Sequence, residues 1–129
     1  MTRTAQEQAN LDLVLAMYRD VLMPMDSARV DDYIAPDYLQ HSSLAAPGVQ
    51  ALKGFLDFVK VQSPDATHNL KRAFVDGDHV VVHHLVIRHA GDPGMAVVDI
   101  FRVAGGRIVE HWDVLQDVPA DPVNPLPMF

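Results

Sequence analysis

The hydrophobic period of this chain changes once, at Pro64, and that change limits what the chain can fold into. Before Pro64, apolar residues recur at the three- and four-residue spacing of amphipathic helices. After it, four β-rich segments are separated by short turns that contain glycine. No repeat, low-complexity tract or linker divides the 129 residues. Helices followed by a sheet therefore predict one α+β domain over residues 1–129.

Three helices are expected before Pro64. The first keeps one apolar face, and Thr4 with Glu7 matches the capping box that starts many helices. The second is short and must end before Pro36, because the residue that precedes a proline is pushed out of the α region. The expected helices cover residues 5–23, the segment around 30–34 and residues 48–61, with a brief extended piece at 38–41.

The segments after Pro64 predict an antiparallel meander, because each connection is short enough for a hairpin. Four prolines in the last eleven residues argue against a further strand or helix there and predict an extended tail over 119–129. The predicted strands cover residues 69–76, 79–89, 95–104 and 107–117.

The loop between the last two strands decides which side chains share a face of the sheet. A three-residue loop at 104–106 places Asp99 opposite His111 and Val97 opposite Asp113, with all four side chains on one face. Phe101, Val103, Val109 and Leu115 join that face, and Ile108 and Trp112 take the other. A two-residue loop would instead separate Asp99 from His111. If the first face lines an enclosed space, desolvation raises the pKa of a carboxylic acid there, so that it can exchange a proton near neutral pH.

Composition excludes several classes of function. The 10 basic residues are scattered and face 17 acidic ones, so no nucleic-acid partner is expected. No apolar run is long enough to span a bilayer and the N-terminus lacks a signal-peptide block, so we expect a cytoplasmic protein with no membrane partner. The absence of cysteine excludes thiol nucleophiles and cysteine-based metal sites. A mean hydropathy of +0.05 is high for so small a domain and predicts a cavity or a subunit interface.

Seven histidines do not form a recognisable metal motif, so no metal is predicted. His83 and His84 are adjacent and point to opposite faces of a strand. One of them, together with His41, is expected to line a pocket, and His83 is the candidate that we name. No nucleophile elbow, phosphate loop or dinucleotide fingerprint is present, which leaves chemistry without a cofactor.

Two segments carry a resemblance to a known family. They are Tyr33–His41 (YIAPDYLQH) and the closing hairpin Val98–Val114, which contains VDIFR and GRIVEHWDV. With three helices ahead of a β-meander, the chain resembles the SnoaL-like proteins of the nuclear transport factor 2-like superfamily. The resemblance implies a cone of helices on a curved antiparallel sheet, a deep apolar pocket for a small hydrophobic ligand, and a homodimer through the outer face of the sheet.

The resemblance also implies a function. Polyketide cyclases of this family close a ring by intramolecular aldol condensation, with no metal or cofactor, and use an aspartate on the last strand for acid–base work. Asp113 matches that position, and Asp99 falls where the cyclases carry a polar partner, a histidine. The implied mechanism is proton abstraction next to a carbonyl, of the aldol cyclase or isomerase type. Asp113 would act as acid and base, Asp99 or His111 would polarise the carbonyl or tune Asp113, and His41 would be a second proton carrier. The expected substrate contacts are Tyr38, Phe55, His83, Phe101 and Trp112.

Two other functions are alternatives to this one. The same pocket can hold an apolar carbonyl compound without chemistry, as a binding module. Epoxide hydrolysis would need an arginine beside two aspartates, and the three-residue loop puts Arg102 on the face away from Asp99. Arg72 or Arg88 could serve instead only if their strands turn them inward.

Overall fold

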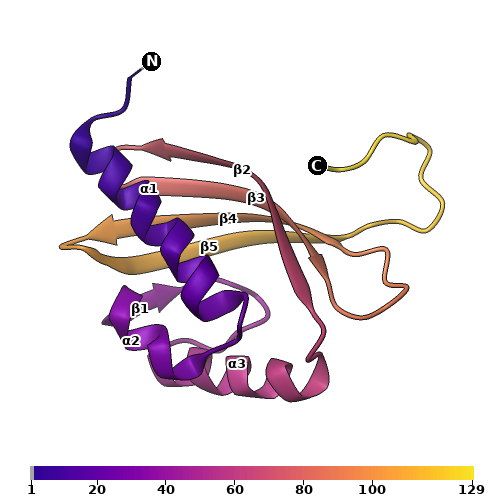
Figure 1. The fold of residues 1–129 in the computed structure, drawn as a ribbon, viewed down its shortest axis with the longest axis horizontal. Coiled ribbons are helices and arrows are strands. Elements are labelled where there is room, and N and C mark those ends of the chain that lie inside the picture. Colours follow the sequence, from indigo (N-terminus) through magenta and orange to yellow (C-terminus); the bar gives the residue numbers. More distant parts are fainter. Residues whose placement is uncertain (1) are drawn as a thin grey trace.

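The computed structural model describes residues 2–129 and confirms the α+β class. Helix α1 (Ala5–Met17) continues as a π-helical turn (Tyr18–Leu22), a 3-10 turn (Ser27–Arg29) leads into α2 (Val30–Tyr33), and strand β1 (Ile34–Gln40) precedes α3 (Val49–Gln62). The remaining strands are β2 (Thr67–Asp76), β3 (His79–Ile87), β4 (Met95–Ala104) and β5 (Arg107–Asp117). Helix α1 crosses the strands and α3 lies beyond the β1 edge (Figure 1).

The N-terminus of α1 is fixed by the predicted capping box. The Thr4 side chain accepts a hydrogen bond from the backbone N–H of Glu7, and the Glu7 carboxylate accepts one from the backbone N–H of Thr4. At its other end the helix widens into the π turn, which begins at Tyr18. Such turns are often found at functional sites. Here the turn directs the Tyr18 hydroxyl towards the sheet, where it donates to Asp99.

The sheet has one strand more than predicted. Its order is β1-β5-β4-β3-β2, and the last four strands form the expected antiparallel meander. The extended piece is longer than predicted, because β1 starts at Ile34 and pairs in parallel with β5. Its register is irregular between Ile34 and Leu39. An edge strand tolerates Pro36 in that irregular stretch because no ladder partner is needed on its open side.

The predicted pairing of the last hairpin is wrong by two positions. Gly105 and Gly106, with φ of 57° and 72°, form a two-residue turn of the kind that needs positive φ at both positions. A bulge after Arg102 then adds one residue to β5. Asp99 therefore lies opposite Asp113 and not opposite His111. The turn and the bulge together change the pairing by an even number, so Asp99, His111 and Asp113 still share one face.

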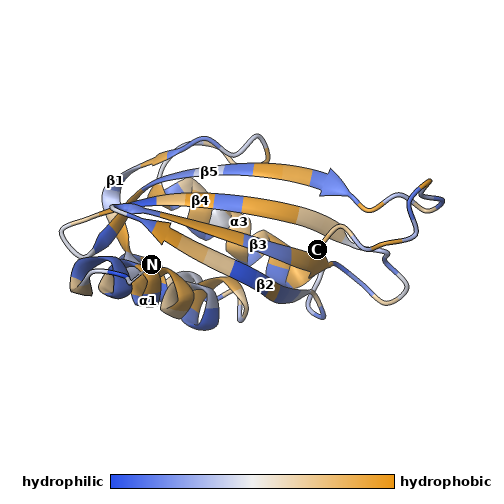
Figure 2. Ribbon diagram, turned by 90° about the horizontal axis from the view of Figure 1, so that it is seen from above, coloured by the Kyte–Doolittle hydropathy of each residue, from blue (hydrophilic) through white to orange (hydrophobic). Residues whose placement is uncertain are grey.

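The bulge also exchanges two residues near the turn. Ile108 is fully buried on the inner face, by which we mean the face of the sheet directed at the helices, whereas Val109 is only partly buried. The three-residue loop predicts the opposite arrangement, which is wrong. Valines of β3 complete the core against α1 and the π turn, because Val80 and Val82 are fully buried in one cluster with Val14 and Val21. Figure 2 shows polar and apolar residues alternating along the strands, as expected for a sheet with two different faces.

Residues 118–129 contain no helix or strand. The tail leaves β5 and turns back, so that the C-terminus lies near β2 and β3 (Figure 1). The Phe129 ring lies 6.4 Å from the His83 ring and 5.4 Å from the Lys71 ammonium nitrogen. Among the described residues, no helix is long and apolar enough to cross a lipid bilayer.

Candidate active site

A cavity of about 370 Å³ lies between the inner face and the helices. Its walls are mostly apolar, with Leu52, Phe55 and Leu56 from α3 facing Val97 and Phe101 from β4. Volumes of this order are typical of pockets that bury a small ligand. The polar side chains that interrupt the apolar walls gather on neighbouring strands of the inner face: Gln40, His68, His84, Asp99, His111 and Asp113.

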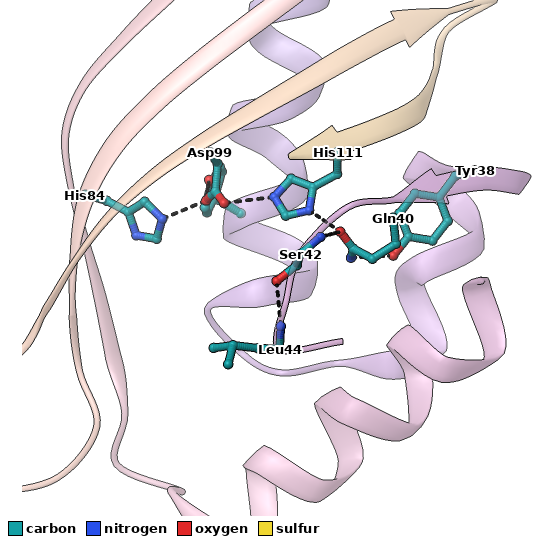
Figure 3. Close-up of polar contacts among 8 residues, drawn as sticks. Tyr38, Gln40, Ser42, Leu44, His84, Asp99 and His111 are labelled. Atoms are coloured by element: carbon teal, nitrogen blue, oxygen red, sulfur yellow. Dashed lines mark hydrogen bonds and ion pairs between the residues drawn. The ribbon is translucent and has the colours of Figure 1, made fainter. Parts of the chain in front are cut away.

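Asp99 is the centre of this polar group. Its side chain is 8% exposed, and it accepts hydrogen bonds from three groups that come from three different elements. His84 Nε2 lies 2.7 Å from Oδ2, His111 Nε2 lies 2.8 Å from Oδ1, and the Tyr18 hydroxyl also donates to Oδ2. Figure 3 shows His84 and His111 on opposite sides of the carboxylate. Burial alone raises the pKa of a carboxyl group, but the bonds from His111 and His84 outweigh it and hold the pKa of Asp99 below its usual range.

The hydrogen bonds of Gln40 and Asp99 determine which ring nitrogen atoms of His111 carry a proton. The backbone N–H of Ser42 donates to Gln40 Oε1 (3.0 Å), which identifies that atom as the amide oxygen. His111 Nδ1 lies 2.7 Å from the same oxygen, so Nδ1 must carry a proton. Because ionised Asp99 accepts at Nε2, that nitrogen carries a proton as well. His111 is then an imidazolium paired with the Asp99 carboxylate.

Tyr38 ends this chain of hydrogen bonds. Its hydroxyl oxygen accepts from Gln40 Nε2 at 2.7 Å, which leaves its own proton available to an acceptor in the cavity. Burial raises the pKa of Tyr38 to about 12, so the hydroxyl stays protonated at neutral pH. The result is a preorganised neutral donor beside an apolar space.

Asp113 differs from Asp99 in that no hydrogen bond or ion pair to its carboxylate occurs within residues 2–129. It is partly buried, lines the cavity and lies opposite Asp99 in the ladder. One side-chain atom each from Asp99, His111 and Asp113 lie within 4.8 Å of one another. Three such groups are a possible ligand set for a cation, but the Asp99 oxygens are already engaged by three donors. A free carboxylate next to an imidazolium is better suited to moving protons.

Three of the predicted site residues lie elsewhere. Trp112 points to the outer face, where its ring stacks on that of His41 with 5.0 Å between centroids. The predictions that Trp112 and His41 face the pocket are therefore wrong, because both lie on the far side of the sheet, and His41 Nε2 contacts Glu110 there at 2.8 Å. His83 is also on the outer face and contacts Arg72. Its neighbour His84 is the histidine that enters the cavity.

The other predicted residues line the cavity together: Tyr38, Phe55, Phe101, Asp99, His111 and Asp113. Sequence reasoning did not name Tyr18, Gln40 or His68. It considered His84 as the alternative to His83, but the run Val80–Val82 is apolar at every position, so alternation could not show which histidine faces inward. Arg102 takes the outer face as expected and pairs with Glu110. Arg88 lines the cavity but is held by Asp92 and Asp117.

His68 packs beside this group, with its ring stacked on His84 at 5.7 Å. Burial lowers the pKa of His68 to about 4. The neutral ring is thus favoured in the fold, whereas the unfolded chain takes up a proton at an ordinary histidine pKa.

This shift predicts acid sensitivity. Because the unfolded state binds the proton more tightly, His68 contributes full stability above about pH 6.5 and loses it as the pH falls towards 4. Between pH 7 and pH 5 we expect the wild-type protein to lose about 2 kcal/mol more unfolding free energy than His68→Phe, which keeps a stacked ring. Urea unfolding at both pH values measures the difference. Equal losses in the two proteins would contradict the assignment.

Comparisons with known proteins show which family this chain belongs to. The family model of the SnoaL-like domain matches residues 14–111, and the chain belongs to that family. Its fold is the nuclear transport factor 2-like cone, with helices on a curved, unclosed sheet. A comparison with curated protein sequences yields no match.

Several solved structures share this fold. IdmH from Streptomyces antibioticus, a proposed polyketide cyclase, is 24% identical, with a TM-score of 0.66 over 82% of this chain and 91% of that one. A loop-truncation variant of IdmH is 26% identical, with a TM-score of 0.69 over the same shares of the two chains. A proposed SnoaL-like polyketide cyclase from Jannaschia sp. CCS1 is 20% identical, with a TM-score of 0.73 over 89% of this chain and 90% of that one. The chain thus shares its fold with proteins that are named as proposed polyketide cyclases.

Proposed function

We propose that this protein catalyses proton transfer next to the carbonyl group of a small apolar compound, without a cofactor, as an aldol cyclase or isomerase does. The observation that carries the proposal is the contrast between two aspartates on facing positions of β4 and β5. Asp99 is held by three donors, whereas the Asp113 carboxylate is free and faces the cavity. Of these two aspartates, only Asp113 can take a proton from a ligand without first breaking a hydrogen bond.

The proposed reaction begins when the Asp113 carboxylate removes a proton from the carbon next to the carbonyl. The negative charge moves to the carbonyl oxygen, and the Tyr38 hydroxyl donates a hydrogen bond to that enolate. In an aldol closure the enolate carbon forms a bond to a second carbonyl carbon of the same molecule, and the resulting alkoxide takes the proton back from Asp113. In an isomerisation Asp113 returns the proton to a different carbon. Either outcome balances without a further reactant.

The His111–Asp99 pair has a supporting role in this scheme. Both ring nitrogens of His111 are engaged, so it does not donate directly to the substrate. Its positive charge lies beside Asp113 and its Nδ1 proton holds Gln40, which in turn orients the Tyr38 hydroxyl. Positioning of this kind removes the cost of arranging the donor during the reaction.

The proposal is tested by exchange of carbon-bound hydrogen. 1-Tetralone, a bicyclic apolar ketone, is incubated with the protein in D₂O, and loss of the proton signal next to the carbonyl is followed by NMR. We expect exchange that is faster than in buffer and proportional to protein concentration. Binding of the ketone without faster exchange would favour the alternative, a binding module with the same pocket.

Tyr38→Phe is expected to slow this exchange by about 100-fold, because a preorganised donor to an enolate oxygen is lost. Affinity for the ketone should change less than the rate, since the ring remains in the wall. The rate is measured by NMR and the affinity by titration calorimetry. A matched Tyr→Phe control is Tyr33, which lies outside the cavity lining, and its exchange rate should equal that of wild type.

The predicted partners remain proposals. Exposed Phe74 (59%) and Val114 (67%) on the outer face support a homodimer through the sheet. A small hydrophobic ligand is supported by the apolar walls of the cavity. The absence of nucleic-acid and membrane partners, and the cytoplasmic location, stay predictions from the sequence.

A further inference from the structure

Two buried nitrogen atoms on the inner face have no hydrogen-bond partner within residues 2–129: His84 Nδ1 and His68 Nδ1. Both residues line the cavity, and His84 as a whole is 2% exposed. Buried polar atoms are nearly always paired in folded proteins, so an unpaired one next to a cavity points to a partner that the ligand supplies.

The chemistry of His84 determines what that partner must be. Its Nε2 donates to Asp99, and Figure 3 shows the other ring nitrogen turned away from that carboxylate. Asp99 already neutralises the imidazolium of His111, and a second positive ring beside it would be repelled and poorly solvated. His84 is therefore the neutral tautomer with its proton on Nε2, and Nδ1 is an acceptor. An acceptor at the end of an apolar cavity requires a donor from the ligand.

We propose that the substrate carries a hydroxyl group, of the phenol or enol type, that donates a hydrogen bond to His84 Nδ1. The inference rests on the proposed function in taking the same cavity as the substrate site, and it adds a substrate class to it. The site then selects a ligand with two polar features: a carbonyl group near Asp113 and Tyr38, and a hydroxyl group that reaches β3. His68, stacked on His84, shields that hydrogen bond from water.

The test compares probes that differ in one group. Affinities are measured for 1-tetralone, for its 5-, 6- and 7-hydroxy derivatives and for the matching methoxy derivatives. At least one hydroxy isomer is expected to bind about tenfold or more tightly than 1-tetralone, since a buried acceptor is costly to leave unpaired. The matching methoxy compound should lose this advantage, because it cannot donate.

The variant His84→Gln tests the role of Nδ1 independently of that of Nε2. The glutamine amide nitrogen can take the place of Nε2 and keep the bond to Asp99, whereas the amide oxygen is an acceptor displaced from the position of Nδ1. The hydroxyl preference is the affinity for the best hydroxy isomer divided by the affinity for 1-tetralone, and we expect it to fall to near one in this variant. Thermal unfolding is monitored to establish that the variant folds. His89→Gln, at an exposed histidine outside the cavity lining, is the matched control and should keep the full preference.

Three results would overturn the inference: no hydroxy isomer binds better than 1-tetralone, the methoxy compound shares the advantage, or the preference survives in His84→Gln. Proton exchange is recorded on the same samples. Exchange without a hydroxyl preference removes this inference and leaves the proposed function intact. A hydroxyl preference without exchange supports this inference about the binding site and contradicts the proposed proton transfer.

Discussion

Asp113→Asn is expected to lower the rate of α-hydrogen exchange in 1-tetralone by about a thousandfold, within the range usual for loss of a general base. An amide has almost the shape of the carboxylate but cannot accept the proton. No hydrogen bond to Asp113 occurs within the described residues, so the fold has little to lose. Affinity for the ketone and the unfolding midpoint should therefore stay close to those of wild type.

The measurement combines NMR exchange rates with calorimetric affinity and urea unfolding on the same preparations. Asp65→Asn is the matched control, because Asp65 is exposed and lies outside the cavity lining. An exchange rate in Asp113→Asn equal to that of Asp65→Asn would remove Asp113 from the mechanism. If both variants lost exchange, the cause would be something other than the cavity carboxylate.

Asp99→Asn is expected to have the largest effect on stability, a loss of about 3–5 kcal/mol of unfolding free energy. The carboxylate accepts from Tyr18, His84 and His111, and an asparagine would turn an NH₂ group towards one of these donors. It would also leave the imidazolium of His111 partly buried without its counter-charge. Total stabilities of small domains are only about 5–15 kcal/mol, so the loss should be plain in urea unfolding.

The pH dependence gives a second measurement for Asp99. Hydrogen bonds hold the pKa of this carboxyl below its usual range, against the effect of burial, so protonation is harder in the folded than in the unfolded chain. The contribution of Asp99 to stability is then complete above about pH 4 and lost as the pH falls below that value. Asp99→Asn should lack this part of the acid destabilisation, whereas Asp65→Asn should retain it. A urea-unfolding midpoint of Asp99→Asn equal to that of Asp65→Asn at neutral pH would contradict the stabilising role of the hydrogen bonds to Asp99.

The two aspartates show how one sheet gives the same residue type two roles. Both lie on the inner face at facing positions of β4 and β5. Asp99 is in the central part of the sheet, where the π turn, β3 and β5 supply three hydrogen-bond donors to it. Asp113 has no such neighbours within the described chain and remains available to a ligand. The difference arises from tertiary packing and not from the local sequence.

The sequence predicted the elements well because helical and strand periods are local properties. The change of period at Pro64, the capping box at Thr4 and the glycine turns locate three helices and four strands within a few residues. The strand β1 was underestimated, since Pro36 lies within it and its pairing to β5 bridges some seventy residues of chain. No local pattern signals a parallel edge strand of that kind.

Within the site, the sequence by itself predicted that Asp99, His111 and Asp113 share a face, because side chains alternate with a period of two. The prediction is confirmed because the two-residue turn and the bulge together change the pairing by an even number. It could not determine which of His83 and His84 faces inward, because the valines before them are apolar at every position. Only the tertiary structure decided that His84, Tyr18 and Gln40 surround the carboxylate and the imidazolium. These contacts join residues far apart in the chain, and their geometry depends on how the strands and α1 pack together.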